Sequence, residues 1–130
     1  MGSPPMNFLT CEIDSDNSLL LLGPETSIRL SDSQLALLKG QQKVLVGIRP
    51  EDIYPDPAVV TKHGGTSFEA TAEVIEPLGA ETLVHLRLNG AALVARLDRE
   101  VSLCTGDRIQ LAVEPTHIHF FDQDTKQALR

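Results

Sequence analysis

The sequence has no tryptophan, one tyrosine and four phenylalanines among its 130 residues. Proteins that bind single-stranded nucleic acids stack the bases on aromatic side chains, and few are available here. The 11 lysines and arginines are scattered singly and outnumbered by 18 acidic residues, giving a net charge of −7. Because phosphate backbones are bound by clusters of basic residues, we expect no nucleic acid partner.

Long hydrophobic runs are also missing. The longest, Leu19 to Leu22, is far shorter than the roughly 20 residues of a membrane-spanning helix. Residues 1–5 lack the basic and apolar regions of a signal peptide. Cys11 and Cys104 lie far apart, so we expect two small buried residues in a reducing compartment, with a disulfide or a reactive thiol as alternatives. The composition predicts one soluble, cytoplasmic domain over residues 1–130.

The sequence contains none of the catalytic motifs that we searched for. A phosphate-binding loop of the G-x-x-x-x-G-K-[ST] type is absent, and residues 62–66 hold its residue types in the wrong order. There is no G-x-S-x-G elbow for a nucleophile. The carboxylate pairs Glu51–Asp52 and Glu73–Glu76 suit acid–base chemistry, but helix ends and solvated strand faces explain them more simply. We expect this chain to hold no cofactor and to catalyse nothing.

Apolar and polar residues alternate along most of the chain, which predicts strands. One face of the strand after residue 67 takes Phe68, Ala70, Ala72 and Val74. Asn89–Gly90 between two alternating segments predicts a tight hairpin. About nine short strands result, which favours an all-β fold with one short helix, an OB-like β-barrel rather than a sandwich. The predicted strands cover residues 9–13, 19–22, 28–30, 44–48, 68–74, 84–88, 92–97, 109–113 and 117–121.

After the third predicted strand, the apolar residues no longer recur at every second position, and the pattern becomes that of a helix. Ser31 and Gln34 form a capping box, and Gly40 is a left-handed stop, so we predict a helix of about two and a half turns. Pro50 suits the first position of a short helical turn. Residues 54–66 are predicted to form a loop.

A polar face is predicted near the end of the chain. His117 and His119 are two apart on the last predicted strand, and Asp122 follows. Two imidazoles and a carboxylate are able to bind zinc. The same alternation places Ile118 and Phe120 inward, however, so we favour solvated or subunit-facing histidines and predict no metal.

Four strings together resemble one family. They are residues 2–9 (Gly-Ser-Pro-Pro-Met-Asn-Phe-Leu), 46–53 (Val-Gly-Ile-Arg-Pro-Glu-Asp-Ile), 76–85 (Glu-Pro-Leu-Gly-Ala-Glu-Thr-Leu-Val-His) and 117–122 (His-Ile-His-Phe-Phe-Asp). Their order and spacing resemble the C-terminal TOBE, OB-like regulatory domain of ATP-binding subunits from maltose- and glycerol-3-phosphate-type ABC importers. The Pro-Leu-Gly-Ala-Glu-Thr sequence is more similar to the glycerol-phosphate and mixed-sugar branch than to the maltose branch. Lys126 stands where relatives commonly have glycine, which disfavours a tight left-handed turn there.

The resemblance implies partners rather than chemistry. It implies a preceding ATPase domain, absent here, that binds ATP and Mg, and a location at the inner membrane through the transporter's permease subunits. It also implies a homodimer, contacts with the ATPase domain and docking of cytoplasmic regulators. We expect these contacts at two strand ends, which comprise Arg49, Pro50, Glu51, Asp52, and Gly79, Ala80, Glu81, Thr82. The alternative is that both segments are turns that serve only the fold. A competing hypothesis is an oxyanion- or sugar-phosphate-binding barrel using Arg49, Arg87 and Arg96.

Overall fold

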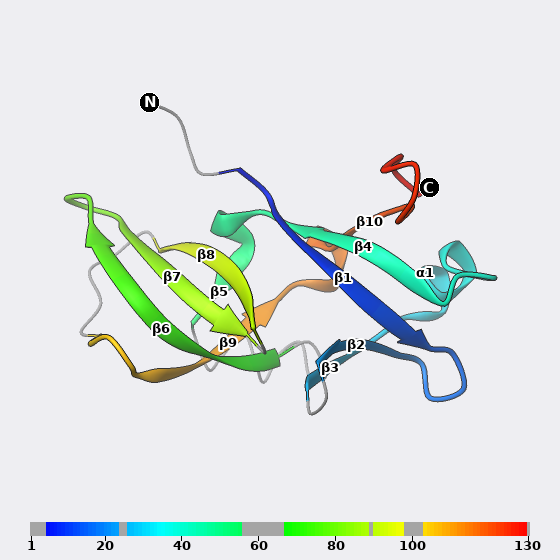
Figure 1. The fold of residues 1–130 in the computed structure, drawn as a ribbon, viewed down its shortest axis with the longest axis horizontal. Coiled ribbons are helices and arrows are strands. Elements are labelled where there is room, and N and C mark those ends of the chain that lie inside the picture. The colour runs from blue at the N-terminus through cyan, green and yellow to red at the C-terminus, as the bar shows by residue number, and fades with distance from the viewer. Residues whose placement is uncertain (1–4, 24–25, 56–66, 89, 98–102, 130) are drawn as a thin grey trace.

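The computed structural model describes residues 5–23, 26–55, 67–88, 90–97 and 103–129 (Figure 1). These residues form ten strands, one α-helix and two short 3-10 helices. The elements in chain order are β1 (Asn7–Asp14), β2 (Leu19–Gly23), β3 (Thr26–Arg29), α1 (Asp32–Leu37), β4 (Lys43–Ile48), η1 (Pro50–Asp52), β5 (Ile53–Tyr54), β6 (Ser67–Pro77), β7 (Thr82–Leu88), β8 (Ala91–Leu97), β9 (Arg108–Val113), η2 (Pro115–His117) and β10 (His119–Phe121).

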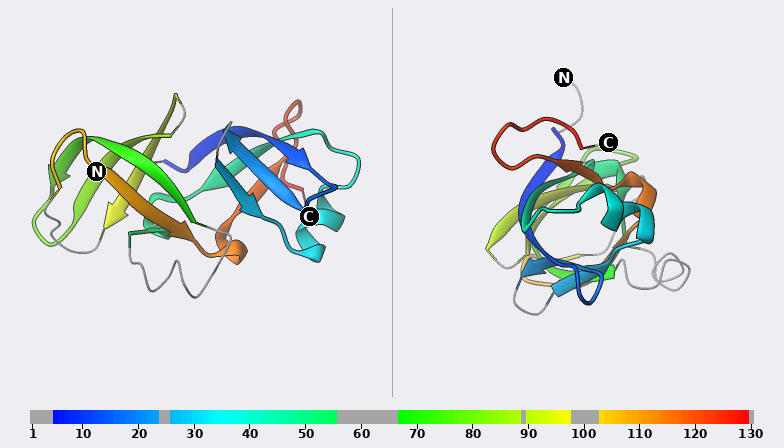
Figure 2. Two further views of the ribbon diagram at one scale, coloured as in Figure 1. Left: turned by 90° about the horizontal axis from the view of Figure 1, so that it is seen from below. Right: turned by 90° about the vertical axis from the view of Figure 1, so that its right-hand side faces the viewer.

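The strands form two antiparallel sheets of five. The first has the order β10-β4-β1-β2-β3, and the second the order β5-β9-β6-β7-β8. The chain builds four strands of the first sheet, then all of the second, and returns to the first with β10. Figure 2 shows the two curled sheets beside each other along the long axis of the molecule. The predicted mostly β, OB-like architecture with one short helix is confirmed.

One hydrophobic core runs through both sheets. Val44 and Val46 of β4 are at most 1% exposed, as are Leu86 of β7 and Leu111 of β9, and all four belong to one cluster. The alternation predicted for β1, β4, β7 and β8 is seen directly in the burial of every second residue. Burial of this apolar surface is the main force that holds the two sheets together.

The predicted helix forms and is shorter than expected. Ser31 accepts the amide of Gln34, and the Gln34 side chain accepts the amide of Ser31, which completes the predicted capping box. The α-helical turns end at Leu37, and Gly40 follows with φ +84°. No described helix has the length and apolar character needed to cross a membrane.

The strand around Val74 departs from the simple alternation. Ala72 pairs with Leu86 and Val74 with His85, so Glu73 is an extra residue in β6. Such a bulge reverses the side-chain alternation beyond it. Val74 is therefore 50% exposed, and Ile75 packs against the core instead. The prediction that Val74 shares the inward face of Ala72 is wrong for this reason.

The last predicted strand is also shorter than expected. Pro115–His117 form η2, and only His119–Phe121 are extended. His117 and His119 therefore do not share a strand face, although Ile118 and Phe120 point inward as predicted. The hairpin between β7 and β8 is confirmed, with Gly90 at φ +86°, while Asn89 lies outside the described residues.

Three further expectations are corrected or limited by the structure. Cys11 is buried, but Cys104 is exposed, in a turn where its amide donates to the carboxylate of Asp107. Lys126 adopts the left-handed conformation, φ +64°, in spite of its side chain. Of the predicted loop, Tyr54 belongs to β5, and residues 56–66 lie outside the described residues.

Candidate functional site

The chain crosses between the sheets at two points that lie side by side. It leaves the first sheet through η1 and returns through η2. The Nδ1 atom of His117 lies 3.4 Å from Asp52 Oδ1 and 3.7 Å from Glu114 Oε2. The pKa of Tyr54 is raised by burial and, to a smaller extent, by the charges of Glu114 and Asp52. The junction therefore joins the predicted corner at residues 49–52 to His117 and places the carboxylates of Asp52 and Glu114 beside it.

The sequence explains why the chain turns sharply at this corner. β4 ends at the buried Ile48, and Arg49 is extended at φ −73° and ψ 145°. Pro50 takes the first position of η1, as predicted, and is itself fully buried. A fixed φ near −65° suits proline to this position, where no amide donor is needed. The amide of Asp52 then donates to the carbonyl of Arg49 at 2.9 Å.

The second predicted segment, Gly79 to Thr82, links β6 to β7. The amide of Leu78 donates to the carbonyl of Glu81 at 2.7 Å, and Gly79 has φ +86°. Left-handed backbone is readily adopted by glycine, which lets the turn close. Thr82 begins β7 and is only 2% exposed.

Arg96 of β8 connects these two segments. Its guanidinium donates to both carboxylate oxygens of Glu81, through Nε and, at 3.0 Å, through Nη2. The pKa of Arg96 is raised by Glu81, with a further contribution from Glu51. β8 also packs against η1. We call Glu51, Glu81 and Arg96 the Arg96 cluster; Arg49, Gly79 and Ala80 of the same two segments are exposed.

The predicted contact residues therefore divide into two kinds. Arg49, Glu51, Gly79 and Ala80 are exposed, and Glu81 and Asp52 are partly exposed. Pro50 and Thr82 are buried and support the surface from below. The role of Arg96 in joining the two segments was missed; its outward place in the alternation of β8 was the available signal.

The predicted polar face does not form a single group. His117 lies at the junction, His119 pairs with Gly47 across β10 and β4, and Asp122 lies in the following turn. The Asp122 carboxylate accepts the amides of Asp124 and Thr125, which lowers its pKa. Within the described part of the chain no three metal-ligating side chains gather.

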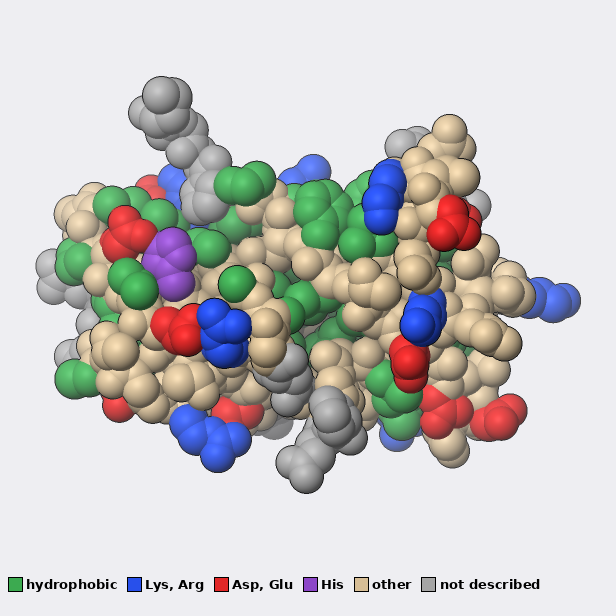
Figure 3. Space-filling view, in the orientation of Figure 1, with side chains coloured by type: hydrophobic (Ala, Val, Ile, Leu, Met, Phe, Trp, Pro, Cys, Tyr) green, Lys and Arg blue, Asp and Glu red, His purple; other side chains and the backbone are tan. Residues whose placement is uncertain are grey.

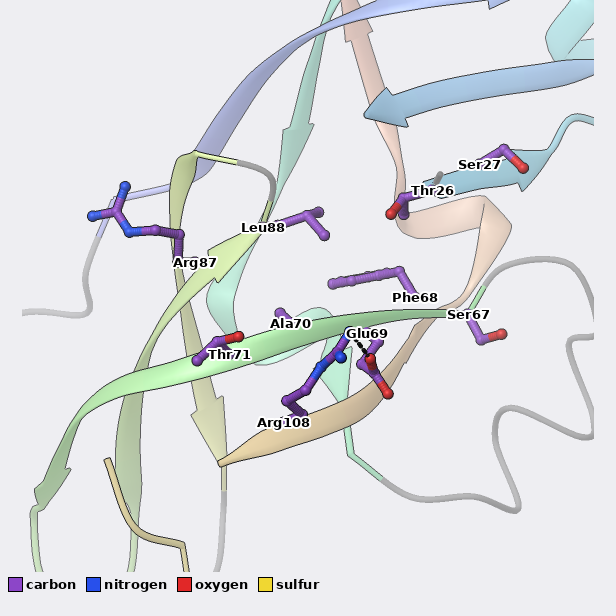
Figure 4. Close-up of a pocket in the computed structure, with 10 residues that line it drawn as sticks. All are labelled: Thr26, Ser27, Ser67, Phe68, Glu69, Ala70, Thr71, Arg87, Leu88 and Arg108. Carbon is purple, nitrogen blue, oxygen red and sulfur yellow. Dashed lines mark ion pairs between the residues drawn. The ribbon is translucent and has the colours of Figure 1, made fainter. Parts of the chain in front are cut away.

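A groove of about 420 Å³ lies between β3 and the second sheet (Figure 4). Its two arginines are each paired with a carboxylate, Arg108 with Glu69 and Arg87 with Glu73. Arg96 is paired with Glu81 in the same way. Two of the three arginines expected to hold an oxyanion are thus already neutralised. The groove is lined by Thr26, Ser27, Ser67, Phe68, Glu69, Ala70, Thr71, Arg87, Leu88 and Arg108.

Two family models match the chain. The MalK OB fold domain matches residues 2–53, and the TOBE domain matches residues 46–121. The overlap, residues 46–53, spans the corner that connects the sheets.

Similar curated proteins match over almost the whole chain. The oligosaccharides import ATP-binding protein MsmX of Bacillus subtilis is 28% identical over 100% of the chain. The sulfoquinovosyl glycerol transport ATP-binding protein SmoE of Agrobacterium fabrum is 32% identical over 99% of it. The trehalose/maltose import ATP-binding protein MalK of Thermococcus litoralis is 33% identical over 99%. The chain spans about a third of the length of these relatives, 35 to 36%.

Among solved structures, the cytoplasmic molybdate-binding protein ModG with molybdate bound superimposes with a TM-score of 0.67. The match covers 92% of this chain and 98% of ModG at 14% identity. At that identity the likeness concerns the fold alone.

Proposed function

This chain belongs to the TOBE domain family, with a MalK OB fold domain in its first part, and on that basis we propose that it regulates and dimerises the ATP-binding subunit of an ABC importer. In this proposal the imported solute is a sugar or glycerol 3-phosphate. The relatives named as import or transport ATP-binding proteins support it, because their similarity extends over the whole chain.

The observation that carries the proposal is the Arg96 cluster. It joins the two segments with the strongest family resemblance, although they are about 30 residues apart in sequence. Arg96 and Glu81 are held together by a two-point ion pair, and β8 packs against η1, which carries Glu51, so the charged groups come from well-ordered elements. A pre-organised charged surface favours specific protein contacts.

We propose that, in the full-length protein, ATP and Mg bind to an ATPase domain that precedes this chain. The subunit is then cytoplasmic and reaches the inner membrane by binding permease subunits, and the Arg96 cluster contacts a second copy, with cytoplasmic regulators as further partners. Such a domain changes ATP hydrolysis only through contacts that differ between the states of the transporter. This chain itself catalyses no step.

Light scattering at micromolar concentration tests the proposal. We expect a dimer when the domain is joined to its ATPase domain, and a weaker monomer–dimer equilibrium when it is alone. A strict monomer in both settings contradicts the dimerisation role, and absence of ATP hydrolysis by the full-length protein contradicts the assignment to an importer.

A further inference from the structure

An apolar groove of about 400 Å³ lies where the C-terminal segment meets the edge of the first sheet. Of the nine described residues that line it, seven are apolar, among them Met6, Leu37, Phe121 and Leu129, and none is acidic. The chain carries 18 acidic residues and a net charge of −7, so this lining differs from most of the surface. Figure 3 shows hydrophobic side chains gathered where β1, β4 and β10 run together.

Close packing gives the groove a fixed floor at one end. A Cβ atom at Gly47 of β4 would meet Met6 Sδ and would lie 2.8 Å from Cε2 of Phe121. The thioether and the ring therefore rest directly on the bare backbone of β4. The C-terminal segment is held beside them because the amide of Leu129 donates to the carbonyl of Phe120 at 2.9 Å.

A second hollow continues the groove toward α1. Its volume is about 310 Å³, and it shares Leu37, Ile118 and Phe120 with the first. Ser31 and Ser33 also line it. The two hollows thus form one apolar track, which suits a linear chain better than a compact, ring-shaped molecule.

Arg49 and His119 are the two remaining residues that line the groove. Within the described part of the chain, neither side chain has a hydrogen-bond or ion-pair partner. Arg87, Arg96 and Arg108, by contrast, are each paired with a carboxylate. A guanidinium donates two parallel hydrogen bonds to a carboxylate, and an imidazole carries at least one N–H donor. The groove therefore combines an apolar track with unused donors for an anion.

We infer that this groove binds a small monocarboxylate with an unbranched apolar chain. The carboxylate is held by Arg49 and His119, and the chain lies along Met6, Phe121 and Leu129. Small-molecule sites have volumes of roughly 300 to 1,000 Å³ and apolar linings with a few polar groups that fix orientation. A single cation matches a single negative charge, which favours a carboxylate over a doubly charged phosphate. The inference does not depend on the proposed function.

Two other occupants suit the groove less well. A stable interface with a second copy involves about 20 to 30 residues on each side, whereas nine described residues line this groove. A second copy also carries a charge of −7, as does every approaching molecule of this chain. The same charge opposes approach to an anionic membrane surface.

Isothermal titration calorimetry of this chain with octanoate, below its critical micelle concentration, tests the inference. The comparison ligands are acetate, which lacks the chain, 1-octanol, which lacks the charge, and inorganic phosphate. Arg49→Gln removes the cation. Arg29→Gln is the matched control, because Arg29 is exposed, has no ion-pair partner among the described residues and lines neither hollow. Circular dichroism shows whether both variants fold like the parent protein.

We expect one octanoate to bind per chain. The Kd should be about tenfold higher or more for 1-octanol and for acetate, and about tenfold higher or more for octanoate in Arg49→Gln. Arg29→Gln should change the Kd of octanoate by less than about twofold. Decanoate should bind about fivefold more tightly than octanoate, because two further methylene groups are buried.

Four outcomes overturn the inference. Equal affinity for 1-octanol and octanoate, or an unchanged Kd in Arg49→Gln, means that the charge plays no part. Affinity for acetate or phosphate equal to that for octanoate means a simple anion site without a chain track. Several octanoate molecules bound per chain mean adsorption to the surface. An apparent affinity that falls as the protein concentration rises identifies a second copy as the occupant.

Discussion

Asn7 of the first sheet is hydrogen-bonded by its side-chain amide to both backbone groups of Val94 in the second. Its Nδ2 donates to the Val94 carbonyl and its Oδ1 accepts the Val94 amide, both at 2.8 Å. The two residues are 87 apart in sequence, and Asn7 is 8% exposed. The Asn7 side chain thus bonds to the Val94 backbone as an adjacent strand would, at the point where the two sheets meet.

Replacing Asn7 with alanine removes both bonds and leaves partly buried backbone groups of Val94 without these partners. We expect the free energy of unfolding to fall by about 2 kcal/mol, measured by urea denaturation. Asn17→Ala, at an exposed asparagine of the β1–β2 turn, is the control and should change stability by less than about 0.5 kcal/mol. Equal losses in the two variants contradict a special role for Asn7.

The Arg96 cluster is tested by Arg96→Ala. If it forms the dimer surface, we expect the dissociation constant of the full-length dimer to rise at least tenfold, measured by analytical ultracentrifugation. Stability should change little, because surface ion pairs contribute about 1 kcal/mol or less. Arg87→Ala removes a similar ion pair, with Glu73, away from the corner and should leave association unchanged.

Gly47→Ala tests the close packing of Met6, Phe8 and Phe121 on the backbone of β4. The added methyl group clashes with Met6 and Phe121, so we expect a loss of about 1 to 3 kcal/mol in thermal or urea unfolding. In a Phe121→Ala background the same substitution should cost clearly less, because the ring that it meets is gone. An unchanged cost in that background means that the clash lies elsewhere.

Lys126 adopts φ +64° although it has a side chain. This conformation costs a non-glycine residue about 1 kcal/mol or more, so Lys126→Gly should stabilise the domain by up to about 1 kcal/mol. Lys126→Ala keeps the unfavourable φ and also loses the bond from Nζ to the Gln123 carbonyl. Stabilisation by alanine but not glycine contradicts this explanation.

Alkaline pH should destabilise the domain through Cys11. Burial raises the pKa of this thiol from 9.0 to about 12. Between those values the unfolded chain loses the proton while the folded chain keeps it, so stability is complete below pH 9 and falls as pH rises toward 12. In Cys11→Ala the slope of the unfolding free energy against pH should be smaller over this range, by an amount that corresponds to up to one proton. This difference in slope does not depend on the stability that is lost by removing the thiol. Identical slopes in both proteins contradict the assignment.

Local patterns were enough to predict most of the fold. The capping box at Ser31, Pro50 at the start of η1 and the β7–β8 hairpin all depend on neighbouring residues, and all are confirmed. Errors arose where a residue's neighbours come from elsewhere in the chain. The bulge at Glu73 depends on pairing with β7, and the amide of Ala72 there also bonds to Asp107.

The site was predictable only in part for the same reason. The two candidate segments were chosen from local patterns and stay a prediction, whereas their connection in the fold depends on Arg96, which is 14 residues beyond Thr82 and on another strand. The contact between Asp52 and His117 joins residues 65 apart. Such relationships follow from where the chain crosses between sheets, which no local pattern records.

The return of β10 to the first sheet has a consequence for the order of folding during synthesis. The ribosome releases β1 to β4 first, but β4 remains an unpaired edge on one side until residues 119–121 have emerged. All five strands of the second sheet have been made once Val113 has emerged. We therefore expect the later-made sheet to mature before the earlier one, and a nascent chain stalled before residue 119 to expose β4 to other unpaired strands.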